Sequence, residues 1–78
     1  MSPFRIEFSS HAQQRLKERT ITRQQIRQCL TDGVLMGLDI RGRKVKNVLL
    51  SKRLLEVIYL ETKNGTLIVT AYWKGRYP

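Results

Sequence analysis

The sequence predicts an α+β fold in which two helices pack on a curved antiparallel sheet. Apolar residues before Gly33 recur at helical spacing, whereas those after Gly33 alternate with other residues, which is typical of strands. An Asn64-Gly65 dipeptide between two alternating segments favours a β-hairpin. The chain has 78 residues, enough for one domain, so we expect residues 1–78 to fold as a single unit.

A short strand and a helix are expected at the N-terminus. Apolar and charged residues alternate over residues 4–8, beginning with Phe4, which predicts a strand. Ser10 and Gln13 have the spacing of a capping box, in which two side chains satisfy free backbone N–H groups of a helix start. We therefore expect the first helix to begin at His11.

A second helix is expected over residues 23–32. Thr22 and Gln25 form another capping box, and Cys29 lies on the apolar side of the helix that follows. Gly33 is a typical end signal, because glycine is common just past the last helical residue.

An antiparallel meander of four strands is expected after the second helix, with residues 4–8 as a fifth strand where they join the sheet. The expected strands are residues 34–40, 45–50, 54–62 and 66–74, and the turns between them are 41–43, 51–53 and 64–65.

The last hairpin is expected to separate an apolar face from an open one. With Asn64 and Gly65 as a two-residue type I′ loop, Tyr59 would lie opposite Thr70. The core side would contain Leu60, Val69, Ile58, Ala71, Leu67 and Trp73. The open side would contain Tyr59, Thr70, Tyr72, Lys74 and Glu61.

The composition favours a polyanionic partner and excludes some kinds of site. The chain carries 15 Lys and Arg against 6 Asp and Glu, a formal net charge of +9 that attracts nucleic acids. The alternative is a basic soluble domain without such a partner. One cysteine and one histidine exclude an internal disulfide and a zinc site built from Cys and His of this chain alone. We expect no metal and no cofactor.

The expected location is the cytoplasm, without a membrane partner. No apolar run approaches the roughly 18 residues that a membrane span needs, and no signal peptide is recognisable. A domain this short buries only about 60% of its unfolded surface and is marginally stable. A partner protein or a homodimer would therefore stabilise it.

His11, Arg15 and Arg19 are four residues apart, so on a helix their side chains fall on one stripe. Two arginines one turn apart repel each other, and a bound phosphate would relieve that repulsion. His11 lies at the positive end of the helix dipole, which favours a neutral imidazole able to act as a general base. The alternatives are an exposed or capping histidine, and a solvated face where Glu18 pairs with Arg15.

Two further groups of residues are candidates for RNA contact. Tyr59, Thr70, Tyr72 and Lys74 share the expected open face, where tyrosines would stack on bases and lysine would bind phosphate. The alternative is a half-buried sheet face, since Tyr and Thr favour strands. The second group is a basic run without an acidic residue, made of Arg41, Arg43, Lys44, Lys46, Lys52 and Arg53. Such a run is often only a solvated surface, but this net charge favours nucleic-acid contact.

A motif spread over nearly the whole chain carries a family resemblance. It consists of H-A-x-x-R-x-x-x-R, an Ile-Thr helix start, a later glycine and a terminal I-V-T-x-Y strand. The chain resembles the domain-of-unknown-function family 4258. The matching residues are His11, Ala12, Arg15, Arg19, Ile21, Gly33, Ile68, Val69, Thr70 and Tyr72. The family commonly has glycine where this chain has Thr20, which affects the turn between the helices.

The resemblance implies a fold like that of the barnase, EndoU, colicin and RelE group of small ribonucleases. Such enzymes cleave RNA without a metal, through a 2′,3′-cyclic phosphate. By position, His11 would be an acid or base, Arg15 and Arg19 would hold the phosphate, and Thr70 and Tyr72 would line the cleft. Helices in this group usually pack behind the sheet, whereas Tyr72 is expected on the open face, an arrangement that would separate His11 from Tyr72.

Three functions remain open. The first is a toxin of a bacterial toxin–antitoxin system that cleaves RNA, free or on the ribosome, and has an acidic antitoxin as its partner. The second is a non-catalytic RNA- or ribosome-binding domain, which needs only a basic face. The third is a toxin that blocks a protein target through its surface.

Overall fold

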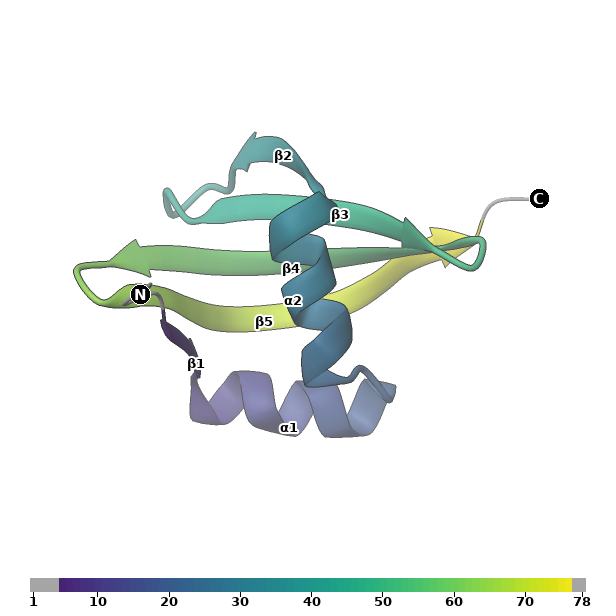
Figure 1. Ribbon diagram of the computed structural model, residues 1–78, viewed down its shortest axis with the longest axis horizontal. Coiled ribbons are helices and arrows are strands. Elements are labelled where there is room, and N and C mark those ends of the chain that lie inside the picture. The colour runs from purple at the N-terminus through teal and green to yellow at the C-terminus, as the bar shows by residue number, and fades with distance from the viewer. Residues whose placement is uncertain (1–4, 77–78) are drawn as a thin grey trace.

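The computed structural model describes residues 5–76, and its element order is the expected one (Figure 1). The elements are β1 (Arg5–Phe8), α1 (Ser10–Arg19), α2 (Arg23–Asp32), β2 (Val34–Leu38), β3 (Lys44–Leu50), β4 (Arg53–Thr62) and β5 (Gly65–Arg76). Phe4, the first residue of the expected N-terminal strand, lies outside the described residues.

The strands form one mixed sheet of five strands in the order β1-β5-β4-β3-β2. Strands β2 to β5 make the expected antiparallel meander. Strand β1 pairs with the start of β5 in parallel, with Arg5 opposite Gly65 and Phe8 opposite Ile68. The α+β prediction with two helices is therefore confirmed, and the N-terminal strand is a true member of the sheet.

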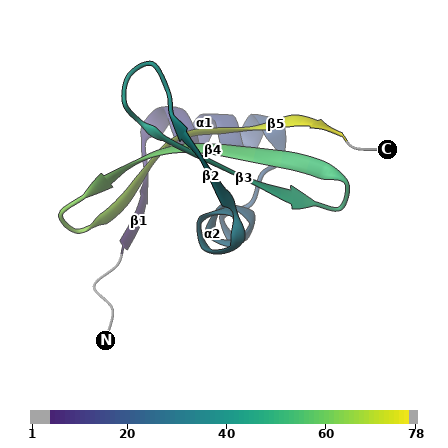
Figure 2. The same ribbon diagram turned by 90° about the horizontal axis from the view of Figure 1, so that it is seen from above.

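The two helices occupy different places on this sheet (Figures 1 and 2). Helix α2 crosses one face over β3 and β4, whereas α1 lies along the β5 edge. The core lies between the helices and the sheet and consists of Ala12, Leu16, Ile21, Ile26, Cys29, Leu55, Val57, Tyr59, Ile68 and Ala71. Neither helix covers the opposite face of the sheet, which we call the open face.

Helix α1 begins one residue earlier than predicted, because Ser9 and not Ser10 is its N-cap. The Ser9 hydroxyl accepts a hydrogen bond from the Ala12 N–H at 3.0 Å and donates to the Val69 carbonyl at 3.3 Å. The Ser9 N–H continues the β1 pairing by donating to the Ile68 carbonyl at 3.1 Å. Ser9 therefore ends the strand and starts the helix, a double role that its sequence position alone does not reveal.

Helix α2 begins and ends where the sequence predicts. The Gln25 N–H donates to the Thr22 hydroxyl at 3.1 Å, and the Thr22 N–H donates to the Gln25 side-chain oxygen at 2.9 Å, which completes the capping box. Gly33 is the C-cap. A Cβ atom at Gly33 would lie 2.3 Å from the Cys29 carbonyl oxygen, so close packing of the helix end requires glycine here.

The β4–β5 hairpin is present, but its predicted loop is wrong by one residue. Lys63 and Asn64 form the loop, and Gly65 is already in β5, paired with Thr62. Gly65 has φ +148°, and a Cβ atom there would lie 2.0 Å from the Arg5 carbonyl oxygen. The glycine is required by the close approach of β1 and not by a type I′ turn.

The predicted register of this hairpin is also wrong. Tyr59 lies opposite Ile68 instead of Thr70. A β-bulge lies between this pair and the next one, in which Ile58 is opposite Thr70. Tyr59 is therefore in the core with 4% of its surface exposed, while Leu60 is 38% exposed. The extra residue of the bulge shifts the pairing by one position. The side chains in the C-terminal half of β5 therefore lie on the faces that the sequence predicted.

Strand β2 is shorter than predicted, because it ends at Leu38 and the chain then turns. Its apolar residues are exposed, as is Ile40 beyond its end. The alternating pattern correctly predicted a strand here. It did not show that this strand lies at the edge of the sheet.

Candidate functional site

Helix α1 carries the predicted stripe of His11, Arg15 and Arg19 (the α1 stripe) on its solvent side. The Arg15 Nε donates to His11 Nε2 at 3.5 Å, so the imidazole and the guanidinium lie side by side. Arg15 also forms an ion pair with Glu18, 2.9 Å between Nη1 and Oε1. The ion pair between Arg15 and Glu18, which was the alternative expected for a solvated helix face, is therefore present together with the contact to His11.

Arg19 fixes the C-terminal end of α1 to strand β5. Its Nη1 donates to the Ala71 carbonyl at 2.8 Å, and the Trp73 indole N–H donates to the Arg19 carbonyl at 3.0 Å. These two bonds align the α1 stripe with the β5 edge.

An acidic residue that sequence reasoning missed lies on the open face. Glu56, in the middle of β4, is only 5% exposed. Its carboxylate accepts hydrogen bonds from the Tyr72 hydroxyl and, at 3.3 Å, from Asn47 Nδ2. Lys74 Nζ forms an ion pair with it at 3.4 Å. We call these residues the Glu56 cluster; the signal for it was an acid inside the apolar run of residues 54–60.

The surroundings of Glu56 keep it ionised and keep Tyr72 protonated. Burial raises the pKa of the Glu56 carboxyl, but the hydrogen bonds from Tyr72 and Asn47 and the charge of Lys74 outweigh it, so the pKa lies below its ordinary value. Burial and the bond to Glu56 raise the pKa of Tyr72 to about 12, while the nearby charge of Arg19 opposes this. The protonated phenol of Tyr72 therefore donates a hydrogen bond to the ionised carboxylate of Glu56 at neutral pH.

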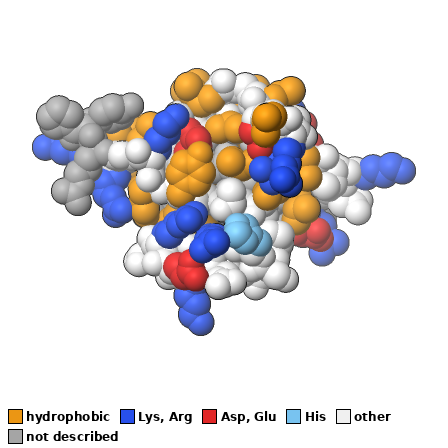
Figure 3. Space-filling view, turned by 180° about the vertical axis from the view of Figure 1, so that it is seen from behind, with side chains coloured by type: hydrophobic (Ala, Val, Ile, Leu, Met, Phe, Trp, Pro, Cys, Tyr) orange, Lys and Arg blue, Asp and Glu red, His pale blue; other side chains and the backbone are white. Residues whose placement is uncertain are grey.

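The Glu56 cluster and the α1 stripe share one side of the molecule. Asn47, Glu56 and Tyr72 are cross-strand neighbours on β3, β4 and β5. Arg19 continues this row at the sheet edge, because its charge acts on Tyr72. The single histidine, pale blue in Figure 3, lies on this side beside Lys and Arg side chains.

His11 and Tyr72 therefore belong to one surface, but they are not in contact. Arg19, the stripe residue nearest Tyr72, is eight positions from His11, which corresponds to about 12 Å along a helix. Thr70, the other β5 residue predicted for the cleft, is half-buried on the same face and lies opposite Ile58.

Tyr59, which was predicted to bind RNA, does not lie on this surface. Its cross-strand neighbours are Lys44 on β3 and Ile68 on β5. Its ring packs in the core, on the side of the sheet that carries α2. Stacking on a base needs an accessible ring face, which Tyr59 does not offer.

The predicted basic run does not form one surface. Arg43 pairs with Asp39 at 2.7 Å, Lys44 pairs with Glu61, and Lys46 Nζ donates to the Leu30 carbonyl at 2.6 Å. Because Lys44 and Lys46 are two residues apart on β3, both point to the side that carries α2. Lys46 thereby satisfies a carbonyl in the last turn of α2.

The rest of the run lies in turns. Arg53 stacks over the Trp73 ring, 3.9 Å from its centroid, and Arg41 and Lys52 are exposed in the β2–β3 and β3–β4 turns. Lys74 is the predicted RNA-binding lysine that the structure places in the Glu56 cluster.

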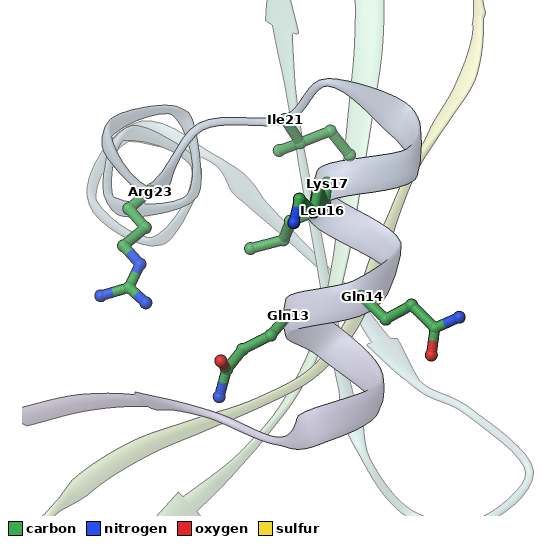
Figure 4. Close-up of a pocket in the computed structure, with 6 residues that line it drawn as sticks. All are labelled: Gln13, Gln14, Leu16, Lys17, Ile21 and Arg23. Atoms are coloured by element: carbon green, nitrogen blue, oxygen red, sulfur yellow. The ribbon is translucent and has the colours of Figure 1, made fainter.

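A shallow hollow between α1 and the start of α2 lies away from these residues (Figure 4). Its lining consists of Gln13, Gln14, Leu16, Lys17, Ile21 and Arg23. It contains none of the predicted site residues. The buried thiol of Cys29 is not a reactive group either, because burial raises its pKa to about 11.

Residues 5–76 contain neither a metal-binding group of side chains nor a membrane-spanning helix. No three side chains of His, Cys, Asp or Glu gather there as a metal-binding group. No helix in this part of the chain is long and apolar enough to cross a membrane.

Comparison with known proteins identifies the family of this chain. A family model described as a domain of unknown function, DUF4258, matches residues 8–73. No curated protein and no solved structure matches the chain. The matched residues include the whole α1 stripe and, apart from Lys74, the Glu56 cluster. The chain therefore belongs to the DUF4258 family.

Proposed function

We propose that this domain is a metal-independent RNA endonuclease that binds RNA across the open face and along α1. The observation that carries the proposal is that the α1 stripe and the half-buried ring of Tyr72 lie on one surface that neither helix covers. A basic chain with net charge +9 supplies long-range attraction for the polyanion.

The binding roles follow from which groups remain accessible. Lys74 pairs with Glu56, and the charge of Arg19 acts on Tyr72. These two cations would hold a backbone phosphate, while the Tyr72 ring stacks on a base. Arg15 would hold the next phosphate along the stripe. Its ion pair with Glu18 is surface-exposed, so exchanging that partner for a phosphate costs little.

His11 would act at the phosphate that Arg15 holds. Its Nε2 lies 3.5 Å from Nε of Arg15, so the imidazole is adjacent to the guanidinium that would hold this phosphate. As a base, the imidazole takes the proton of a ribose 2′-hydroxyl, and the 2′-oxygen forms a bond to phosphorus. The bond to the 5′-oxygen breaks, and water supplies a proton to that leaving group. The products are a 2′,3′-cyclic phosphate and a 5′-hydroxyl.

Glu56 has a positioning role in this scheme. It is too deeply buried to reach a substrate, but it fixes the Tyr72 hydroxyl and draws Lys74 over the face. An ionised carboxylate with three partners holds these two side chains in one arrangement before RNA binds.

The test is incubation of the purified chain with RNA in excess chelator, followed by mapping of the product ends. Cyclic phosphate and 5′-hydroxyl ends that disappear in His11→Ala support the proposal. Gln14→Ala is a matched control, because it truncates another exposed side chain on the same helix. Cleavage that needs a divalent metal, or that His11→Ala retains in full, contradicts it.

A second candidate is a non-catalytic RNA- or ribosome-binding domain. One observation favours it: the group that contacts His11 is Arg15, which does not exchange protons at neutral pH, whereas cleavage commonly uses two acid–base groups. Salt-dependent RNA binding without any chelator-resistant cleavage would identify the binder. As a toxin, the domain would stop growth when expressed and would be neutralised by an acidic antitoxin.

A further inference from the structure

Strand β2 leaves an unusual amount of apolar surface at one edge of the sheet. Its four apolar residues are each between 52% and 66% exposed, namely Val34, Leu35, Met36 and Leu38. Leu49 on β3 is 52% exposed and Ile40 is fully exposed. In Figure 3 hydrophobic side chains gather along the upper edge, where β2 lies. Contiguous apolar patches of this kind mark interaction sites in soluble domains.

The apolar side chains project on both sides of this edge. Val34 lies opposite Asn47 and therefore on the open face, while Leu35 lies opposite Lys46 and on the α2 side. As the outermost strand, β2 also directs half of its backbone N–H and C=O groups away from β3. An added strand would satisfy these groups and cover apolar side chains above and below the sheet.

We propose that an extended acidic segment of a partner protein binds here as a sixth strand beside β2. Arg41 is exposed in the turn that follows β2, and the whole chain has a net charge of +9, whereas Arg43, Lys44 and Lys46 already have partners. A second copy of this chain would bring the same charges against that surface. A segment with alternating apolar and acidic residues fits both the apolar edge and the charge beside it. This inference does not rest on RNA cleavage.

The β-bulge in β2 limits the length over which a partner strand can pair with it. The pairing with β3 shifts between Leu35 and Gly37, and Gly37 has φ +125°. A bulge twists an edge strand and interrupts a regular ladder. Contacts with the exposed side chains on either side of the bulge therefore contribute much of the affinity, and Leu38 is the most exposed of them within the strand.

The experiment is selection from a displayed library of random peptides on the immobilised full chain, followed by titration of synthetic peptides. The enriched peptides are expected to alternate apolar with acidic residues. Leu38→Glu is expected to weaken binding by about tenfold or more, since like charges at an interface cost more than about 1.4 kcal/mol. Arg41→Glu should also weaken it, whereas Lys17→Glu should not. Lys17→Glu changes the net charge equally, but on α1 at the opposite edge.

A control peptide that keeps the same apolar and acidic residues but has prolines inserted separates strand addition from simple charge attraction. Proline cannot donate ladder hydrogen bonds, so this peptide should lose most of the affinity. Three outcomes overturn the proposal: enriched peptides that are basic or uncharged, binding that survives Leu38→Glu, and a dimer of this chain in solution that Leu38→Glu dissociates. The last outcome would assign the edge to a second copy.

Discussion

The two edges of the sheet are finished in opposite ways. At the β1/β5 edge the chain covers itself: β1 extends the sheet, and α1 is tied to β5 by the Arg19 and Trp73 hydrogen bonds. At the β2 edge no described element follows, and apolar side chains meet solvent. The covered edge is polar and positively charged on its outside, whereas the uncovered edge is apolar.

This difference separates two kinds of interaction on one small domain. A charged stripe fixed to a rigid edge suits a polyanion, whose affinity comes from many phosphate contacts. An apolar strand with free backbone groups suits another polypeptide. RNA and a protein partner could then bind at opposite edges, and the following changes test whether the edges are independent.

The largest expected effect is on catalysis at the covered edge. His11→Ala should lower the cleavage rate by about 10²–10⁴-fold, because a positioned acid or base contributes roughly this much. RNA affinity and the melting temperature should change little, since His11 is exposed. Single-turnover kinetics and a binding titration on the same RNA measure both. A fall in melting temperature with unchanged activity per folded molecule would make His11 a structural residue.

The next effect concerns stability and contrasts the core with the uncovered edge. Leu55→Ala should lower the free energy of unfolding by about 2–5 kcal/mol, because Leu55 is 0% exposed and its loss leaves a cavity. Leu38→Ala should change it by no more than about 0.5 kcal/mol, as is usual for exposed positions. Denaturant titrations of the isolated chain compare the two. Similar losses would mean that β2 is already covered in solution.

A smaller effect is expected on the salt dependence of RNA binding. Arg15→Gln combined with Lys74→Gln should reduce the slope of log affinity against log salt by about 1.4, since each phosphate contact to a single strand contributes about 0.7. Arg41→Gln, beside the uncovered edge, is the control and should leave the slope unchanged. An equal reduction by Arg41→Gln would place RNA on both edges.

The smallest effect is on acid stability. The pKa of Glu56 is lowered in the folded chain from its ordinary value of 4.5, so its stabilising contribution is complete above pH 4.5 and is lost as pH falls through the folded pKa. Glu56→Gln should therefore flatten the loss of stability below pH 4.5. Glu18→Gln is the matched control at the covered edge. The pKa of Glu18 is also lowered, by its hydrogen bond from Arg15, but Glu18 is exposed and should matter less.

Much of the candidate site follows from local sequence. The four-residue spacing of His11, Arg15 and Arg19 needed only a helix, and the helix formed there. The two β5 residues Thr70 and Tyr72 also lie on the predicted open face. Glu56 was missed because its partners, Asn47 and Tyr72, are close only after three strands have paired.

The hairpin shows where local rules stop. Asn64-Gly65 correctly located the reversal of the chain, but the glycine served a different purpose, the close approach of Arg5. The sequence also did not show the β-bulge beside Tyr59, which shifts the pairing by one residue, and such a shift exchanges the faces on which side chains lie. Tyr59 was therefore assigned to the surface, although it belongs to the core.

The sequence by itself determined the order of the elements, the limits of α2 and the stripe on α1. Caps and helical spacing act over a few neighbouring residues, so they are readable from the chain alone. The tertiary structure decided the register of β4 and β5, the burial of Glu56 and the exposure of β2. These depend on contacts between distant segments, such as Gly65 with Arg5 and Ser9 with Val69, and on which strand lies at an edge with no neighbour to cover it.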